Sequence, residues 1–141
     1  MALKKLSAYP VYKGHYHLVA STKYRGNFFQ REEMRVRLKE IIEDVVESLE
    51  DVELEACSVA YNHIHVLVKT SRDISKVAGG IFGASSRRMR AEFKELVEKH
   101  PEALWGGKSC SGIQDEIHLQ RCISYINRHL PDNTKLDDEI A

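Results

Sequence analysis

Hydrophobic positions along the chain switch between a period of two, typical of strands, and a period of three to four, typical of helices. The alternating stretches predict strands at residues 9–20, 53–61 and 63–70, with a short one between 104 and 113. The helical periods cover residues 30–49, 73 toward 99, and 115 to just before Pro131. This order, β-α-β-β-α-β-α, predicts an α+β, ferredoxin-like (RRM-like) fold. Such a fold is an antiparallel sheet with helices on one face, here with an added C-terminal helix.

Two local details complete this prediction. Asn62 offers a tight turn, so the strands on either side of it should form a hairpin. Gly79, Gly80 and Gly83 lie inside the second helix. Each glycine costs about 1 kcal/mol in a helix interior, so they indicate a break, a close packing contact or a mobile segment.

The bulk composition is that of a globular domain. Of 141 residues, 43% are hydrophobic and 30% charged, which predicts one domain over residues 1–131 followed by a polar tail at 132–141. Three cysteines without C-x-x-C spacing argue against a disulfide framework or zinc ribbon and fit a reducing cytoplasm. No apolar stretch approaches the ~20 residues of a membrane span, so we expect a cytoplasmic protein with no membrane partner.

Charge is segregated, although the net charge is zero. Residues 1–39 hold nine Lys/Arg and two Glu, whereas residues 40–56 hold eight Asp/Glu and no Lys/Arg. Residues 76–94 are again basic. Such segregation can build a basic, nucleic-acid-binding face on a neutral protein, but ordinary solvated helix faces explain it about as well.

The tripeptide His63-Ile64-His65 carries the most informative chemistry. Side chains alternate along a strand, so both imidazoles face one way, and two imidazoles are half of a divalent-metal site. His15 and His17 form a second such pair. Either pair alone is more often a plain strand face, but the apolar run Val66-Leu67-Val68 and a possible third ligand favour the later pair. Because the first and third strands are neighbours in this fold, we expect His17 near the site.

The third ligand candidate is His129, four residues after Tyr125 in the last helix. This spacing stacks both side chains on one helix face. The stripe beside them, expected to face the core, consists of Leu119, Ile123, Ile126 and Leu130. A tyrosine at such a place is often only packed against the core, but the neighbouring imidazole favours a functional role.

Two histidines, a tyrosine and a third imidazole point to phosphodiester chemistry. A divalent cation neutralises a phosphodiester oxygen and stabilises the transition state. With a pKa near 10, only about a thousandth of a tyrosine is phenolate at neutral pH, so it must be activated. Its attack stores the bond energy in a phosphotyrosine, which allows rejoining without ATP. Imidazole ligands suit Mn, Zn, Co or Ni better than Mg, which leaves the ion open.

A phosphate-contact surface is predicted at residues 83–90. Small hydroxyl residues there allow close approach, and Arg87, Arg88 and Arg90 supply forked donors; the alternative is a solvated helix face. Aromatic residues between 24 and 29 could stack on bases, although Phe28 and Phe29 also suit packing against the following helix.

The chain resembles TnpA-type single-tyrosine HUH transposases of the insertion sequence 200/605 family. The matching motifs are Tyr16-His17-Leu18-Val19, Thr22-Lys23-Tyr24-Arg25, Asn62-His63-Ile64-His65-Val66-Leu67-Val68, residues 83–90, Leu104-Trp105 and Tyr125-Ile126-Asn127-Arg128-His129. The resemblance implies a transposase that cuts and rejoins single-stranded DNA through a 5′-phosphotyrosine and recognises a DNA hairpin at the element's end. It also implies a homodimer in which the tyrosine helix of one protomer serves the histidine pair of the other.

The resemblance assigns roles to residues. Tyr125 would be the nucleophile, and the ligands of a divalent ion (Mg or Mn, with other transition ions as alternatives) would be His63, His65 and His129. DNA contacts would come from Arg87, Arg88, Arg90, Lys23 and Arg25, with His17 and Asn62 supporting the ligands.

Two positions depart from the family pattern. Asn62 replaces the usual aspartate, which should alter only hydrogen bonding to a ligand. His129 replaces the usual glutamine or asparagine, which could strengthen metal binding, change the preferred ion or mark lost activity. The alternative function is a catalytically silent or domesticated nucleic-acid-binding protein on the same fold. A metal hydrolase using bound water is disfavoured, because no base for the water is evident.

Overall fold

The computed structural model describes residues 11–132. Its elements are β1 (His15–Thr22), the 3₁₀ turn η1 (Lys23–Arg25), α1 (Glu32–Ser48), β2 (Val52–Val59), β3 (His63–Thr70), α2 (Ile74–Glu92), α3 (Lys94–Lys99), β4 (Trp105–Gly112) and α4 (Glu116–Asn127). The predicted order of strands and main helices is confirmed. The predicted polar tail lies, except for its first residue, outside the described residues.

The four strands form one antiparallel sheet in the order β2-β3-β1-β4. β2 and β3 make the predicted hairpin around Asn62, closed by the Ala60 amide donating to the His63 carbonyl at 2.8 Å. β1 lies beside β3, with Val19 opposite His65 and Ser21 opposite His63. The first and third strands are therefore neighbours, as expected.

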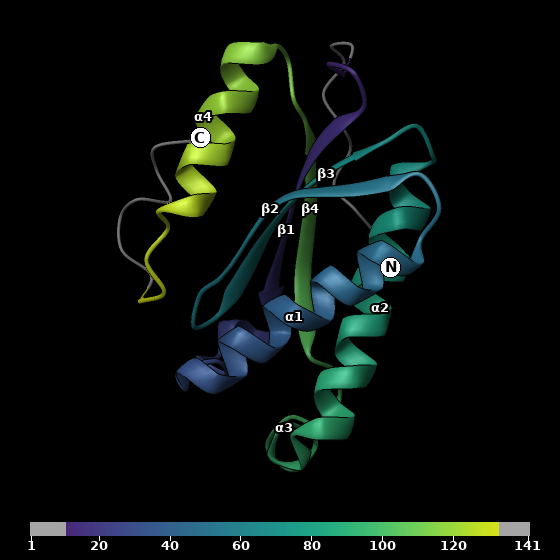
Figure 1. Ribbon diagram of the computed structural model, residues 1–141. Helices are drawn as coiled ribbons and strands as arrows, with labels where there is room; N and C mark the ends of the chain where they lie inside the picture. The colour runs from purple at the N-terminus through teal and green to yellow at the C-terminus, as the bar shows by residue number, and fades with distance from the viewer. Residues whose placement is uncertain (1–10, 133–141) are drawn as a thin grey trace.

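Helices cover both faces of this sheet (Figure 1). α1 and α2 pack on one face over the main core, to which β3 contributes Ile64, Val66 and Val68. α4 covers the other face and packs on β2 and β3. There, Leu67 lies in a second, smaller cluster with residues of α4. The expected placement on one face therefore holds for α1 and α2, and α4 forms a third layer.

The predicted start of β1 at residue 9 is wrong for the residues that are described there. Lys13 and Gly14 have φ of 48° and 75°, and the His15 amide donates to the Tyr12 carbonyl at 3.0 Å, so the chain turns before the strand. A Cβ on Gly14 would lie 2.4 Å from the Thr70 carbonyl oxygen. Glycine is needed at this close approach, and the strand begins just after it.

Of the three alternatives for the glycines of the second helix, a break is excluded. α2 runs through Gly79, Gly80 and Gly83 without interruption, because it buries Ile81 and Phe82 in the main core. Burial of this apolar face outweighs the propensity cost of the glycines. The helix ends instead at Phe93, whose backbone (φ −115°, ψ 87°) separates α2 from the short α3.

Within residues 11–132, none of the helices has the length and apolar character needed to cross a bilayer.

Candidate active site

The strand β3 positions His63 and His65 as the sequence predicted. Ile64 between them is fully buried in the main core, so both imidazoles project to the opposite face, toward α4. Both histidines are themselves buried. The apolar residues that follow them fix this strand in the centre of the sheet, next to β1. The pair therefore lies on a rigid surface.

α4 brings Tyr125 and His129 to the same place. The helix begins after Asp115, whose carboxylate accepts from the His118 amide at 2.8 Å, a regular N-cap. It ends at Asn127, so His129 lies just beyond its last turn, with its amide donating to the Ile126 carbonyl at 3.3 Å. Tyr125 is only 2% exposed. The face of α4 that carries Tyr125 therefore packs on the sheet.

The predicted core stripe of α4 needs correction. Leu119 and Ile126 are buried, but Leu130 is 48% exposed because the chain leaves the helix before reaching it. Ile123 is partly buried against the same cluster, so the predicted stripe is wrong only at Leu130. Cys122 and Tyr125, which we expected beside the core, pack in that cluster as well.

The three imidazoles converge on one point. One nitrogen from each of His63, His65 and His129 lies within 4.8 Å of the others, and the Nε2 atoms of His63 and His129 are 3.1 Å apart. Two nitrogens bound to a single ion at about 2.0–2.1 Å would be separated by roughly 3.3 Å. A three-histidine set that leaves a position open is typical of catalytic metal sites. The donors present therefore fit a divalent metal ion.

Tyr125 adjoins this cluster. Its ring centroid lies 5.5 Å from that of His65 and 5.3 Å from that of His129. All four side chains come from one chain, from the strand β3 and from the C-terminal end of α4. The structure thus brings together the tyrosine and the three histidines that the sequence singled out.

Two further residues orient the histidines. The Asn62 Oδ1 lies 2.7 Å from the His63 Nδ1, which leaves the His63 Nε2 directed at His129. The His17 Nε2 lies 2.9 Å from the His65 Nδ1. Hydrogen bonds of this kind fix the tautomer and orientation of metal-binding imidazoles. Both residues that we expected to support the ligands are in contact with one.

The earlier histidine pair does not make a second metal site. His15 pairs instead with Glu55, at a distance from the three-histidine cluster along the sheet. Burial, then the nearby charges of His118 and His129, lower the pKa of His17 to about 4. His17 is therefore neutral at neutral pH, with one ring nitrogen available to donate and the other to accept.

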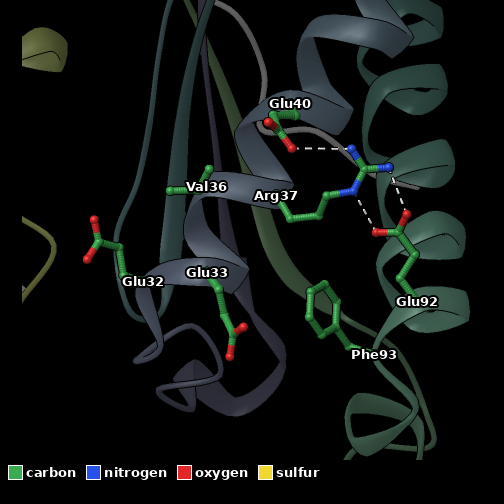
Figure 2. Close-up of a pocket in the computed structure, with 7 residues that line it drawn as sticks. All are labelled: Glu32, Glu33, Val36, Arg37, Glu40, Glu92 and Phe93. Carbon is green, nitrogen blue, oxygen red and sulfur yellow. Dashed lines mark hydrogen bonds and ion pairs between the residues drawn. The ribbon is translucent and has the colours of Figure 1, made fainter.

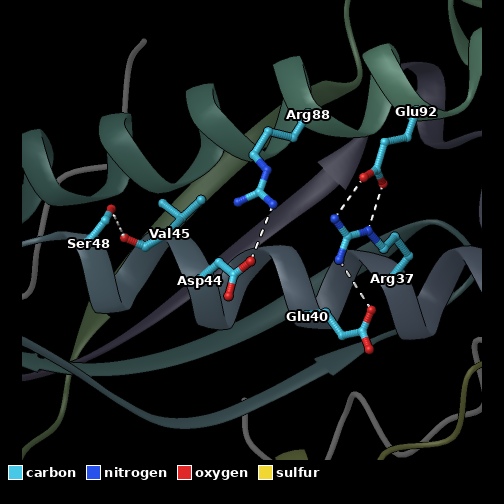
Figure 3. Close-up of polar contacts among 7 residues, drawn as sticks. All are labelled: Arg37, Glu40, Asp44, Val45, Ser48, Arg88 and Glu92. Carbon is cyan, nitrogen blue, oxygen red and sulfur yellow. Dashed lines mark hydrogen bonds and ion pairs between the residues drawn. The ribbon is translucent and has the colours of Figure 1, made fainter.

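The three predicted arginines belong to α2, which packs on the face of the sheet opposite to α4 (Figure 1). The Arg88 Nη2 lies 3.3 Å from the Asp44 carboxylate of α1 (Figure 3), and the Arg90 Nη2 donates to the Pro101 carbonyl at 2.8 Å. Arg87 is exposed. Ser85, expected on the same surface, is buried and accepts from the Trp105 indole at 3.2 Å. Of this segment, Arg87 is the most available for a phosphate.

Lys23 and Arg25 lie at the end of β1, on the side of the sheet where β3 begins. The Arg25 guanidinium donates to the Ser21 hydroxyl at 3.3 Å, and the Asn62 amide donates to the Arg25 carbonyl at 3.4 Å. Lys23 approaches the ring of Tyr24, which is 79% exposed. This basic turn is tied through Asn62 to the histidine cluster, so the two DNA-contact candidates here lie closer to it than those of α2.

The two phenylalanines after this turn are packing residues. Phe29 is fully buried and Phe28 stacks on His100, with ring centroids 3.6 Å apart. Phe29 belongs to the main core and the partly buried Phe28 packs against it, which favours the packing interpretation.

A large hollow of about 570 Å³ lies between α1 and α2, away from the histidines (Figure 2). Arg37 is neutralised there by Glu92, with contacts of 2.7 Å, and by Glu40 at 3.3 Å. The hydrogen bond from Arg37 holds the pKa of Glu92 below its ordinary value. With further carboxylates from Glu32 and Glu33, this hollow repels anions and does not suit a nucleic acid.

Comparisons with known proteins identify the family of this chain. The sequence profile of the family described as "Transposase IS200 like" matches residues 10–129. A solved structure from Deinococcus radiodurans R1, assigned as a transposase, is 30% identical with a TM-score of 0.66, covering 90% of this chain and 98% of that one. A REP-associated tyrosine transposase bound to a REP hairpin is 16% identical with a TM-score of 0.57, covering 89% of this chain and 70% of that one. No curated protein matches. The chain belongs to the IS200-like transposases, a family of DNA-processing enzymes.

Proposed function

We propose that this protein cleaves and rejoins single-stranded DNA at the ends of an insertion sequence, with Tyr125 as the nucleophile and residues 1–131 as one catalytic domain. The observation that carries the proposal is the position of the Tyr125 ring, 5.5 Å from His65 and 5.3 Å from His129 in ring centroids. A tyrosine packed only for stability would not require three converging imidazoles beside it. Family membership makes DNA the expected substrate.

The chemistry follows from the phenol. The Tyr125 Oη attacks a backbone phosphorus and forms the new P–O bond of a 5′-phosphotyrosine. The P–O3′ bond breaks, the phenol loses its proton and the departing 3′ oxygen takes one up. In the second step a 3′ hydroxyl attacks the phosphotyrosine, restores a phosphodiester and releases Tyr125. One phosphodiester is exchanged for another, so no external energy source is needed.

His63, His65 and His129 would hold the divalent ion, Mg or Mn or another transition ion. When bound, it would supply positive charge to a non-bridging phosphate oxygen and to the phenolate. Asn62 and His17 hold two of these imidazoles in place through their hydrogen bonds. Since Tyr125 is almost fully buried, we expect DNA binding to shift α4 on the sheet.

We further propose that a DNA hairpin is the recognised end structure. The REP-associated relative is bound to a hairpin. This chain offers Arg87 on α2 and the basic turn Lys23–Arg25 as phosphate contacts. Arg88 and Arg90 would also contact phosphates once DNA displaces their present partners. These partners are the Asp44 carboxylate for Arg88 and the Pro101 carbonyl for Arg90.

We also propose that the protein is a homodimer, in which α4 of one protomer completes the active site of the other. In the single chain described here, α4 rests on its own sheet, and an exchanged α4 would make the same contacts in a partner. Mixing Tyr125→Phe with His63→Ala protein tests the exchange. With exchange, random mixing restores about a quarter of the sites. Without exchange, no site is restored and the arrangement within one chain is the working one.

The proposal is tested by covalent trapping. Protein, Mg or Mn and a labelled pool of single-stranded oligonucleotides carrying hairpins are incubated and resolved on a denaturing gel. We expect label at protein size, which chelator and Tyr125→Phe both abolish. Hairpin binding without any adduct would contradict the enzyme and favour the silent DNA-binding protein.

A further inference from the structure

A cavity of about 280 Å³ opens beside the histidine cluster. It lies between α1, the edge strand β2 and the segment that follows α4. Its lining includes Arg35, Lys39, Ser58, Asn127, His129 and Pro131. Because His129 belongs both to the histidine cluster and to this lining, the cavity adjoins the candidate active site.

Ser58 lines the cavity from the edge strand β2. It is paired with His65 across the β2–β3 ladder, so its side chain projects to the same face as the histidines. Its hydroxyl oxygen is buried, and within residues 11–132 it has no hydrogen-bond partner. Buried hydroxyls are nearly always satisfied, by protein, water or ligand. This hydroxyl therefore points to a polar group that binds in the cavity.

The cavity is positively charged on its α1 side. Lys39 is exposed. The Arg35 guanidinium is held in place by donating through Nη1 to the carbonyls of Phe29 and Gln30, at 2.8 and 2.6 Å, and by lying over the Tyr61 ring. One carboxylate, that of Glu32, also lines the cavity. Two cations against one carboxylate, next to a neutral hydroxyl donor, favour an anion.

We propose that this cavity binds the backbone phosphate adjacent to the scissile one in single-stranded DNA, and the inference rests on the proposed function of the neighbouring site. The Ser58 hydroxyl and the Lys39 ammonium donate to its non-bridging oxygens, and Arg35 supplies a second positive charge. Directly opposed residues of paired strands lie roughly 5 Å apart, so Ser58 and His65 can serve neighbouring phosphates of one strand. The contact fixes the register of the strand relative to Tyr125.

The test uses hexadeoxythymidylate as the probe and the Tyr125→Phe protein, in which cleavage cannot intervene. Amide chemical shifts and affinity are measured over a range of salt concentrations. We expect shifts at Ser58 and Lys39, and Lys39→Ala should weaken binding and reduce the slope of log K against log salt by about 0.7, the value for one phosphate contact. Ser58→Ala should weaken binding without changing that slope. Lys76→Ala, which removes an exposed lysine of α2, is the matched control.

Three results would overturn the proposal: no binding of the hexamer, shifts confined to other surfaces, or a Lys39→Ala effect equal to that of Lys76→Ala. A hexamer with uncharged methylphosphonate linkages should lose the preference for Lys39. Inorganic phosphate producing the same shifts at equal concentration would contradict a strand-binding site in favour of a simple anion site. A Lys39 effect without adducts in the trapping assay would refute only the enzyme, and adducts without a Lys39 effect would refute only this inference.

Discussion

The Nε2 atoms of His63 and His129 lie 3.1 Å apart, although 66 positions separate these residues in the chain. The contact exists because β3 and the end of α4 meet on the face of the sheet that α1 and α2 leave uncovered. It closes a three-imidazole cluster beside Tyr125. The proposed metal site and the proposed nucleophile thus depend on the same docking of one helix.

Metal binding should stabilise the protein and depend on all three imidazoles. At a free ion concentration 100 times the Kd, the free energy of unfolding should rise by about 2.7 kcal/mol. Thermal unfolding with and without Mn²⁺ or Zn²⁺ measures this, and His63→Ala should abolish it. His129→Gln, which substitutes the residue usual in the family, should lower the Zn²⁺ affinity by roughly an order of magnitude and favour Mg²⁺ or Mn²⁺, because an amide oxygen is a harder ligand. An unchanged ion preference would show that His129 is not a ligand.

Asn62 should control metal affinity without binding the metal. Asn62→Ala removes the acceptor 2.7 Å from the His63 Nδ1, and loss of such a partner typically weakens metal binding about 10–100-fold. Asn62→Asp retains an acceptor and should keep the affinity or raise it. Calorimetric titration with Mn²⁺ compares the two variants. Equal losses in both would mean that Asn62 acts through the fold of the hairpin and not through His63.

The three cysteines report on the docking of α4. Burial raises the pKa of Cys57, Cys110 and Cys122 to about 12, so at pH 8 only about one thiol in ten thousand is a reactive thiolate. Reaction with a thiol reagent should therefore be slow and should accelerate as the pH rises toward 12. Cys122 lies in the small cluster under α4, whereas the other two belong to the main core.

We accordingly expect Cys122 to be labelled first, because undocking of α4 exposes it while the main core stays closed. Mass spectrometry of peptides after timed labelling follows each cysteine. Equal labelling rates at all three positions would contradict a separately mobile α4.

The arginines of α2 should differ in their contribution to DNA binding. Arg87 is exposed, so Arg87→Ala should weaken hairpin binding and reduce the salt slope by about 0.9, as for one phosphate contact on a duplex. Arg88 already pairs with Asp44 (Figure 3), so Arg88→Ala should cost less. Fluorescence anisotropy with a hairpin at several salt concentrations measures both slopes. A larger loss for Arg88 would reverse this assignment.

Local sequence patterns were sufficient to predict the order of the elements and the four side chains that meet in the candidate site. Alternation placed His63 and His65 on one strand face, and a spacing of four placed Tyr125 and His129 together. That second prediction holds although α4 ends at Asn127, because the chain continues in a turn that keeps His129 beside the helix.

Features set by contacts between distant residues were not predictable in this way. Glycines that weaken an isolated helix do not interrupt α2, since the main core holds its apolar face. The pairing of Arg88 with Asp44 depends on how α2 packs beside α1. The Ser58 hydroxyl, which has no partner within residues 11–132, depends likewise on which elements meet around β2. Periodicity alone also does not specify the face of the sheet on which α4 docks.

The most direct test of the nucleophile is mass spectrometry of the trapped covalent adduct. Trypsin cuts after Arg121 and Arg128, and the peptide 122–128 contains a single tyrosine, Tyr125. We predict that this peptide carries the added mass of a nucleotide joined to Tyr125 through its 5′ phosphate. An adduct on any other residue, or cleaved DNA with no protein-bound nucleotide, would contradict it.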